Sequence, residues 1–260
     1  MQIITLTTDW KSNDYYIGAV KGALYSTCPG VQVVNLAHEI PPFNIRHTSF
    51  VLRNTYPHFP PNTIHMVSVM SHEKVNEQGF LIAESSGQYF IMPDSGIISL
   101  IFPDGAESVV RVKPTNLSPV FPMLSAYVEA AGKLVQGKKP EEIGTPETTY
   151  NKSTIVRATF EANVITGSIT HIDTYANVIT NISQKLFSKV GKKRSFEIFP
   201  GSSHYKVTRI SKAYNEVDPG DIFALFNSLG LLEIGIFQGN FAELLGLDIH
   251  STIRIHFKDK

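Results

Sequence analysis

The feature that most constrains the fold is a change of pattern in the second half of the chain. Up to about residue 137, short apolar runs typical of buried strands alternate with segments of helical periodicity. From Thr154 onward strand patterns dominate, separated by Gly and Asn turns. The sequence therefore predicts an α/β N-terminal domain with a mostly parallel sheet and an all-β, barrel-like C-terminal domain. The expected domains are residues 1–150 and 151–260.

In the first domain, three buried strands alternate with helices, and a hairpin follows. Asp14 is the expected N-cap of the first helix, and the turn residues Ser85-Ser86-Gly87 join the two hairpin strands. The polar stretch 138–153 resembles an inter-domain linker, because it contains two prolines and a glycine. The expected strands are 3–7, 31–37, 63–69, 80–83 and 88–91, and the expected helices are 14–28, 44–54, 96–102 and 125–135.

The second domain is expected to consist mainly of strands with two short helices. The expected helices are 184–190 and 241–245. The expected strands are 155–160, 164–172, 177–182, 196–199, 222–227, 231–236 and 252–257.

Composition excludes several classes of protein. The chain has 23 Lys and Arg against 23 Asp and Glu, so it lacks the net positive charge of a general nucleic-acid binder. Cys28 is the only cysteine, which rules out an intramolecular disulfide and a Cys-rich metal site. We expect it to be a small apolar residue at a helix end. No secretory leader or membrane-length apolar run is evident, so a soluble, cytoplasmic protein is expected, with no membrane or nucleic-acid partner.

Motifs for common cofactors are missing from the sequence. There is no Walker loop, no dinucleotide fingerprint and no Gly-x-Ser-x-Gly elbow. The nine histidines include no i, i+4 pair around an acidic residue, so no metal site is expected. We expect most of these histidines to be structural or exposed.

Two short segments carry candidate binding residues. Asp9 follows the first expected strand, where ligands of open α/β sheets bind, and a carboxylate there can accept two hydrogen bonds from a ribose diol. Capping of a turn is an equally good interpretation of Asp9 and the better one for Asp14. In the second domain, Asp173, Tyr175 and Asn177 combine a carboxylate, an aromatic ring and an amide that suit a purine. The same residue types also suit a plain β-turn.

Taken in order, several segments resemble the family of S-adenosylmethionine adenosyltransferases, which includes hydroxide adenosyltransferases, fluorinases and chlorinases. The resemblance covers nearly the whole chain, and the ordered set is more specific than any single piece. The matching segments are Leu6-Thr7-Thr8-Asp9, Asp14-Tyr15-Tyr16-Ile17-Gly18, His38-Glu39-Ile40-Pro41-Pro42, Tyr56-Pro57-His58-Phe59-Pro60, Pro93-Asp94-Ser95-Gly96, residues 172–182, Leu232-Glu233-Ile234 and Gln238-Gly239-Asn240.

The resemblance implies a homotrimer that takes S-adenosylmethionine as substrate and needs no other cofactor. The ligand would lie between the N-terminal domain of one subunit and the C-terminal domain of its neighbour. Asp9 would hold the ribose hydroxyls, with Phe43 beside the sugar and Trp10 lining the site. The implied roles of the others are as follows: Asp173 and Ser228 at the amino-acid end, Tyr175 and Asn177 beside adenine, and Phe237 in the segment that closes the base pocket.

The sequence departs from the family where water is activated. Met70 stands in place of an aspartate, Glu77 or Gln78 in place of an arginine, and Pro122 in place of a histidine. A general base contributes typically about 10²–10⁴-fold, so these losses weigh against ordinary hydroxide transfer. Leu229 stands where the halogenating members of the family have an arginine, and Phe237 stands where an asparagine is usual in the family.

Three hypotheses follow, and no catalytic residue is assigned. In the first, the chain is an active enzyme that displaces methionine from the ribose C5′, with His72 or Glu73 as a replacement base. Alternatively, it is a non-catalytic protein that binds an adenosyl ligand, or a trimeric scaffold that has lost the site. Halogenation is disfavoured because Met70 and Pro122 do not reproduce a halide pocket.

Overall fold

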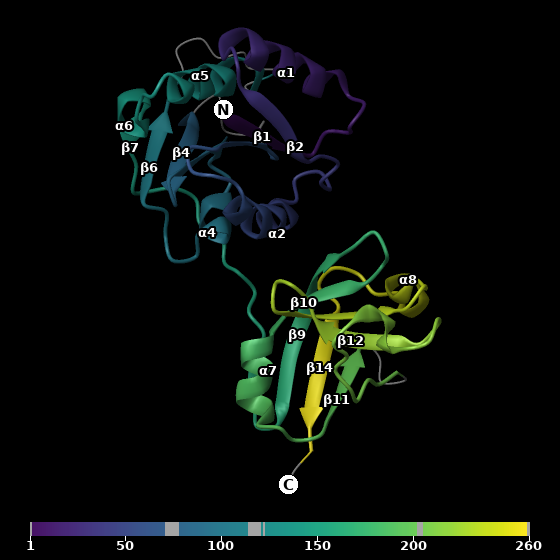
Figure 1. Cartoon of the computed structure of the whole chain (residues 1–260). Helices are drawn as coiled ribbons and strands as arrows, with labels where there is room; N and C mark the ends of the chain where they lie inside the picture. Colours follow the sequence, from purple (N-terminus) through teal and green to yellow (C-terminus); the bar gives the residue numbers. More distant parts are fainter. Residues whose placement is uncertain (1, 71–77, 114–120, 122, 202–204, 259–260) are drawn as a thin grey trace. The chain divides into compact units, whose positions relative to one another are not determined.

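The computed structural model describes residues 2–70, 78–113, 121, 123–201 and 205–258. The chain divides into two compact units, Met1–Ile155 and Val156–Lys260 (Figure 1). Each unit has its own sheet and its own hydrophobic core, and each is described by itself.

The described residues of unit 1 form a seven-stranded sheet in the order β2-β1-β3-β5-β4-β6-β7. The pairings of β1 with β2, β1 with β3 and β3 with β5 are parallel, and the remaining three are antiparallel. The strands are β1 (Ile3–Thr8), β2 (Gln32–Ala37), β3 (Ile64–Ser68), β4 (Phe80–Ser85), β5 (Gln88–Pro93), β6 (Ser108–Val112) and β7 (Thr145–Pro146).

The prediction of a mostly parallel sheet is therefore wrong in its second half, where the sheet is mixed. The cause is the two-residue turn Ser86-Gly87, whose φ angles of 54° and 67° suit the tight turn of a hairpin. So short a connection forces β4 to run antiparallel to β5, because a parallel crossover needs a dozen or more residues.

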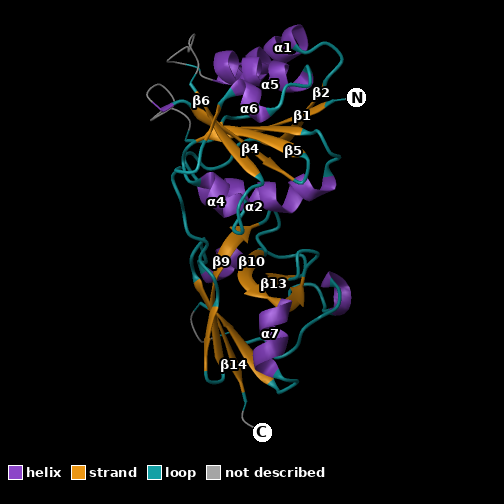
Figure 2. Ribbon diagram, turned by 90° about the vertical axis from the view of Figure 1, so that its left-hand side faces the viewer, coloured by secondary structure: helices purple, strands orange, loops and turns teal. Residues whose placement is uncertain are grey.

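Helices cover both faces of this sheet (Figure 2). On one face, α1 and α5 pack with apolar residues such as Val20, Leu24 and Ala131 against β1, β3 and β4. On the other face, α2 and α4 contribute Leu52 and Ile98 to a second apolar cluster. The helical segments are α1 (Tyr15–Thr27), α2 (Ile45–Thr55), the 3₁₀ turn η1 (Tyr56–His58), α4 (Ile97–Ile101), the π turn η2 (Met123–Tyr127), α5 (Val128–Val135) and α6 (Pro140–Ile143).

Two local predictions about helix α1 can be compared with its structure. Cys28 lies at the C-cap, is 1% exposed and belongs to the core, as expected of a small apolar residue. Asp14 holds the N-cap position, but its carboxylate accepts a hydrogen bond from the backbone of Lys11 at 2.8 Å and none from the first turn of the helix. Asp14 therefore stabilises the preceding turn.

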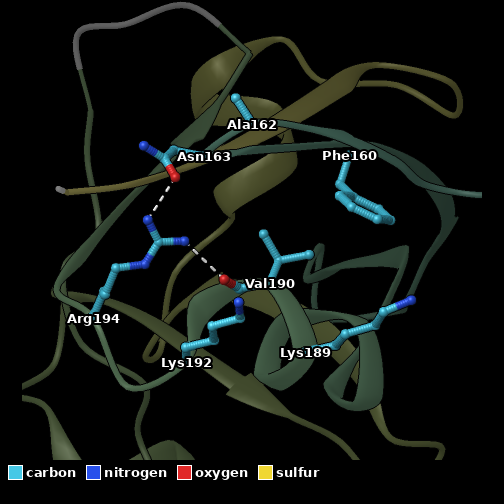
Figure 3. A pocket seen from close by; sticks show the side chains of 7 residues that line it. All are labelled: Phe160, Ala162, Asn163, Lys189, Val190, Lys192 and Arg194. Atoms are coloured by element: carbon cyan, nitrogen blue, oxygen red, sulfur yellow. Dashed lines mark hydrogen bonds between the residues drawn. The ribbon is translucent and has the colours of Figure 1, made fainter.

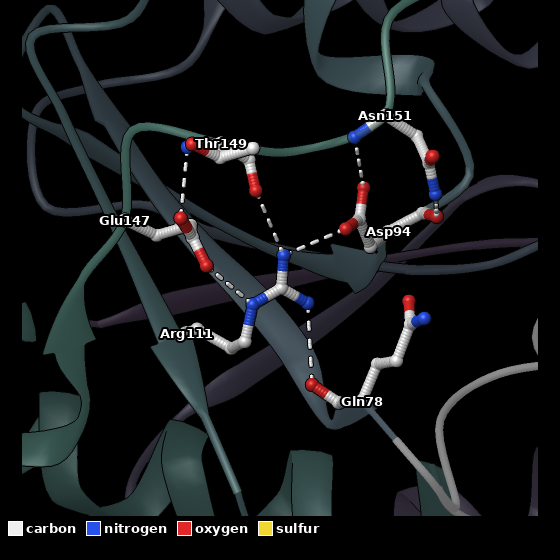
Figure 4. Close-up of polar contacts among 6 residues, drawn as sticks. All are labelled: Gln78, Asp94, Arg111, Glu147, Thr149 and Asn151. Atoms are coloured by element: carbon white, nitrogen blue, oxygen red, sulfur yellow. Dashed lines mark hydrogen bonds and ion pairs between the residues drawn. The ribbon is translucent and has the colours of Figure 1, made fainter.

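The polar stretch 138–153 is not a free linker, because it belongs to unit 1. Its α6 packs near β6, and its β7 extends the sheet. Arg111 of β6 fixes the segment that follows: Arg111 donates to Glu147 at 2.6 Å and to Asp94 at 2.7 Å (Figure 4). Asp94 also accepts a hydrogen bond from the backbone of Asn151 at 2.8 Å.

Unit 2 contains an antiparallel sheet in the order β11-β14-β9-β10-β13-β12, with β8 paired to β9. Within the described residues no ladder joins β11 to β12, so the unit is a curled antiparallel sheet. The strand expected over 155–160 is largely irregular. The elements are β8 (Thr159–Glu161), β9 (Val164–Ile172), β10 (Val178–Ser183), α7 (Gln184–Gly191), β11 (Phe196–Pro200), the 3₁₀ turn η3 (Tyr214–Glu216), β12 (Ile222–Phe226), β13 (Leu231–Ile236), α8 (Phe241–Leu245) and β14 (Thr252–Phe257).

The helices of the described residues are all too short or too polar to cross a lipid bilayer. The cytoplasmic location stays a prediction.

Candidate functional site

In unit 1, the carboxyl ends of the parallel strands gather the predicted residues on one edge of the sheet. Asp9 follows β1, and Met70 follows β3, the neighbour of β1. Asp9 Oδ2 accepts a hydrogen bond from the backbone N–H of Phe43 at 3.3 Å, and Phe43 is 61% exposed. The structure thus brings Asp9 and Phe43 together, and within the described part of the chain Asp9 Oδ1 accepts no hydrogen bond. One carboxylate oxygen is available for a ligand hydroxyl.

Trp10 lies in a cluster of aromatic rings beside Asp9. Its ring centroid is 5.4 Å from that of Tyr16 and 5.3 Å from that of Phe121. The cluster packs on the core, so Trp10 is partly buried. Its position supports the adjacent Asp9, and a direct contact with a ligand stays a prediction.

The predicted edge also contains His38, which the sequence reasoning treated as structural. The Nδ1 atom of His38 shares a hydrogen bond of 2.7 Å with the hydroxyl of Thr8, the last residue of β1. Its Nε2 atom is buried without a hydrogen-bond partner in the described structure. Burial, and then the charge of Lys21, lower the pKa of His38, so the ring is neutral at pH 7. Its position directly after β2 is the sequence signal that could have identified it as a site residue.

Backbone strain is concentrated at the same edge. Glu39, Phe43 and Met70 have φ angles of 60°, 63° and 57°, in the left-handed region that non-glycine residues seldom adopt. Each such residue costs on the order of 1–3 kcal/mol and persists only where the surroundings enforce it. Three such residues in the segments that follow β2 and β3 at one edge are typical of a functional site.

The proposed replacement bases His72 and Glu73, together with Glu77 and Pro122, lie outside the described residues. Gln78 lies just before β4, where its carbonyl accepts a hydrogen bond from Arg111 at 3.2 Å. The water-activation predictions stay predictions.

In unit 2, four of the predicted residues line one cavity of about 600 Å³: Asp173, Tyr175, Asn177 and Phe237. Ser228 is not part of the lining, and it lies exposed in the turn between β12 and β13. The lining also includes residues that sequence reasoning did not assign: Thr174, Tyr214, Phe223, Ile236, Gln238, Gly239 and Asn240.

The rim of this cavity is the turn between β9 and β10, which Asp173 organises. Its Oδ1 accepts from the backbone N–H of Tyr175 at 2.9 Å and of Asn177 at 2.8 Å. Its Oδ2 accepts from the side-chain amide of Asn177 at 3.1 Å. These bonds fix the turn and leave the ring of Tyr175 75% exposed, available to stack on a flat ligand.

The floor of the cavity depends on Gly235 of β13. A Cβ atom at this position would lie 2.0 Å from Asn177 Oδ1 and 2.5 Å from the ring of Phe223. The missing side chain therefore lets Asn177 and Phe223 approach the sheet. Ala176 and Gln238 adopt left-handed backbone with φ of 59° and 56°, so strain occurs at this cavity as well.

Tyr214 adds a second ring and a hydroxyl to the wall, and its ring centroid is 5.3 Å from that of Phe223. Burial and the neighbouring charges of Glu233 and Asp173 raise the pKa of Tyr214 to about 12. The hydroxyl therefore stays protonated and donates a hydrogen bond to the carboxylate of Glu233. Tyr214 lies far from Asp173 in sequence, and no local pattern marks it.

A different cavity of unit 2, of about 580 Å³, is lined by the basic residues Lys189, Lys192 and Arg194 (Figure 3). Arg194 is held by Asn163 Oδ1 at 2.5 Å and by the carbonyl of Val190 at 2.8 Å. The three cations lie at the C-terminal end of α7, where positive charge offsets the helix dipole. We attribute this cluster to helix stabilisation.

No group of three or more His, Cys, Asp or Glu side chains in the described ranges is arranged to hold a metal ion.

Both units match sequence models of one known protein family. The sequence model of the SAM hydroxide adenosyltransferase N-terminal domain matches residues 4–144, and that of the C-terminal domain matches residues 167–254. The chain belongs to this family.

Relatives and solved structures span nearly the whole chain. A protein named (R)-S-adenosyl-L-methionine hydrolase from Methanocaldococcus jannaschii is 26% identical, over 98% of this chain and 96% of the relative. A fluorinase from an Actinoplanes species is 24% identical, over 73% of this chain and 74% of its own length. The crystal structure of an uncharacterized conserved protein from Thermotoga maritima superposes with a TM-score of 0.88 at 26% identity, over 98% of this chain and 99% of that chain.

Proposed function

We propose that this protein cleaves S-adenosylmethionine by nucleophilic displacement at the ribose C5′, giving methionine and either adenosine or a 5′-substituted product. The observation that carries the proposal is the cavity in unit 2. Its aromatic rings, its amides and its ordered Asp173–Asn177 turn match the needs of an adenosyl ligand, and the cavity lies within the C-terminal family match. The names of the relatives support the same reaction.

In this proposal the protein acts by binding and orienting. Tyr175, Tyr214 and Phe237 provide apolar ring surface for the adenine, and the amide of Asn177 provides polar contacts at its edge. Asp9 accepts hydrogen bonds from the ribose hydroxyls through its open Oδ1. Asp173 attracts the ammonium of the methionine end, with Ser228 in the neighbouring turn.

The chemistry needs no cofactor beyond the substrate. The nucleophile's lone pair forms the new bond at C5′ while the C5′–S electrons return to sulfur, so methionine leaves as a neutral thioether. When water is the nucleophile, one proton is released to solvent. Exclusion of water from the nucleophile and alignment of the reacting atoms supply the acceleration.

We further propose a homotrimer in which the N-terminal unit of one subunit and the C-terminal unit of its neighbour supply the two halves of the site. Light scattering on the full chain tests this arrangement. A monomer at micromolar concentration would contradict it.

The activity is tested by incubating the full chain with S-adenosylmethionine and measuring methionine and the adenosine product by liquid chromatography and mass spectrometry. We expect both products in equal amounts, and at least a tenfold loss of turnover in Asp9→Asn and Asn177→Ala, because each removes a contact to the ligand. Asp104→Asn, an exposed residue of unit 1, is the matched control. Turnover no higher than that of heat-denatured protein would contradict the enzyme proposal, and binding without turnover would favour the non-catalytic alternative.

A further inference from the structure

Glu233 is a buried acidic residue beneath the cavity of unit 2. Its side chain is on β13 and 3% of the residue is exposed. Oε2 accepts a hydrogen bond from the amide of Asn227 at 3.0 Å. Oε1 is buried, and the hydroxyl of Tyr214, which lines the cavity, also bonds to this carboxylate. Both partners are neutral, so within the described residues the buried carboxylate has no counter-charge, which is costly.

Strand register places Glu233 on the same face of the sheet as the cavity. Glu233 pairs with Ile179 of β10 and with Leu225 of β12, two residues along β13 from Gly235 in the cavity floor. The alternate residues of β13, Leu232 and Ile234, face the core. The side chain of Glu233 therefore points away from the core and toward the layer that contains Asn177 and Phe223.

The groups around Glu233 are short of positive charge. β10 presents Ile179 and Asn177 to this face, and β12 presents Leu225 and Phe223, none of which titrates. The titratable neighbours are Asp173 from the turn between β9 and β10, and Tyr214 from η3. His171 of β9 lies one strand further, opposite Ile179. The described lining of the cavity contains no Lys, Arg or His, and its one carboxylate is Asp173.

Glu233 also connects two parts of the proposed site. Through its bond to Asn227 it supports the turn after β12, because Asn227 Oδ1 accepts from the backbone N–H groups of Leu229 at 3.0 Å and Leu231 at 3.2 Å. This turn contains Ser228. The hydroxyl of Tyr214 donates to the carboxylate of Glu233, and the charge of Glu233 holds this hydroxyl protonated.

We propose that Glu233 is a positioning and specificity-determining residue. Its negative charge beneath the cavity makes the protein bind a positively charged adenosyl ligand more tightly than a neutral one. The inference rests on the proposed function. Beyond that function, it identifies Glu233 as the residue that distinguishes a sulfonium ligand from the thioether of the same shape. Two unit charges about 10 Å apart, at an effective dielectric constant of about 20, change affinity by about tenfold.

The charge selection should depend on pH. Burial, together with the charge of Asp173, raises the pKa of Glu233 above its ordinary value. A cationic ligand stabilises the ionised form, so its binding releases protons and strengthens as pH rises through the pKa of Glu233 in the free protein. A neutral ligand gains nothing from this ionisation. A purely structural role would change the affinities for both ligands equally.

The test is calorimetric titration of the full chain with S-adenosylmethionine and with S-adenosylhomocysteine, its neutral thioether analogue, between pH 5 and pH 8. For the wild type we expect a preference for the cation that grows with pH to about tenfold. In Glu233→Gln, which keeps the shape and an acceptor for Asn227, the preference should fall at least threefold and lose its pH dependence. Glu161→Gln on β8, an exposed carboxylate outside the lining of this cavity, is the matched control and should behave as wild type.

The outcomes separate the two proposals. A wild type that binds both ligands, with a cation preference unchanged in Glu233→Gln, would overturn the role of Glu233 and leave the proposed function intact. A wild type that binds neither ligand would overturn both. If Glu233→Gln unfolds, Glu233→Asp replaces it: this variant keeps the charge and should retain the pH-dependent preference, and its loss there would contradict the proposal.

Discussion

Arg111 in unit 1 and Glu233 in unit 2 are two charged side chains removed from water, and they are treated very differently. The guanidinium of Arg111 bonds to two carboxylates, Asp94 and Glu147, and to the carbonyls of Gln78 and Thr149 (Figure 4). The carboxylate of Glu233 has two neutral donors, Asn227 and Tyr214, and no counter-charge within the described residues. A charge saturated by opposite charges stabilises its fold, whereas one left without a counter-charge is available for a cationic ligand.

The largest expected effect on stability is at Arg111, whose charge is paired with two carboxylates. Arg111→Ala should lower the free energy of unfolding by about 4 kcal/mol, because it leaves Asp94 and Glu147 partly buried without a counter-charge. Urea denaturation measures this loss. Lys133→Ala, which removes an exposed ion pair with Glu129, should cost less than about 1 kcal/mol. Equal losses in the two variants would show that the Arg111 cluster contributes no more than a surface pair.

A second fully hydrogen-bonded group in unit 1, the ring of His65, predicts how the stability of the protein changes in acid. His65 is fully buried, and its ring bonds to Thr5 Oγ1 at 2.8 Å and to Gln88 Oε1 at 2.7 Å. Burial lowers the pKa of His65 to about 4. The stability that comes from the neutral ring is complete above about pH 6.5 and is lost as pH falls toward about 4, amounting to about 3 kcal/mol.

The measurement is urea denaturation of wild type and His65→Gln between pH 7 and pH 4. At pH 7 the variant should be less stable than the wild type. Between pH 7 and pH 4 its free energy of unfolding should fall by about 3 kcal/mol less than that of the wild type. Parallel pH dependence in the two proteins would contradict the assignment.

An intermediate effect is expected at the rim of the cavity. Asp173→Ala should cost about 2 kcal/mol, because it removes the acceptor of three hydrogen bonds in the turn between β9 and β10. Asp173→Asn keeps an oxygen for the two backbone donors and should cost under about 1 kcal/mol. Thermal unfolding of both variants checks the order, and equal costs would show that the turn does not depend on these bonds.

The smallest effect is on the unsaturated side and has the opposite sign. Because the pKa of Glu233 is raised, the folded protein holds a proton that the unfolded chain loses, so stability falls as pH rises above about 4.5. Glu233→Gln should therefore raise the free energy of unfolding at pH 8, by less than the changes above, and leave it nearly unchanged near pH 4. Destabilisation at both pH values would mean that Glu233 is a structural residue like Arg111.

The sequence predicted local elements well and long-range arrangement poorly. Strand 164–172 and helix 241–245 have the predicted bounds, because apolar alternation and turn residues act locally. The parallel character of the sheet and the linker 138–153 were predicted wrongly. The hairpin that makes the sheet mixed was itself predicted from its turn residues, but its consequence for the strand directions was not drawn. The place of residues 138–153 depends on Arg111 reaching Asp94 and Glu147, which leaves no periodic signal.

The candidate site shows the same limit. Asp9 was predicted from its place after a strand, and Asp173 and Asn177 from a short segment. Tyr214 of η3 joins them in the cavity through tertiary packing, because its ring contacts that of Phe223 on β12, which pairs with β13 and through it with β10. The buried oxygen of Glu233 depends on this register too, so sequence reasoning assigned it no role.

The most direct test of the account is a crystal structure of the full chain soaked with S-adenosylmethionine. We predict density for an adenosyl group whose adenine lies in the unit 2 cavity beside Tyr175, Asn177 and Tyr214, and whose ribose hydroxyls contact Asp9. An empty cavity at saturating ligand, or a ligand bound away from Asp9 and the 173–177 turn, would contradict it.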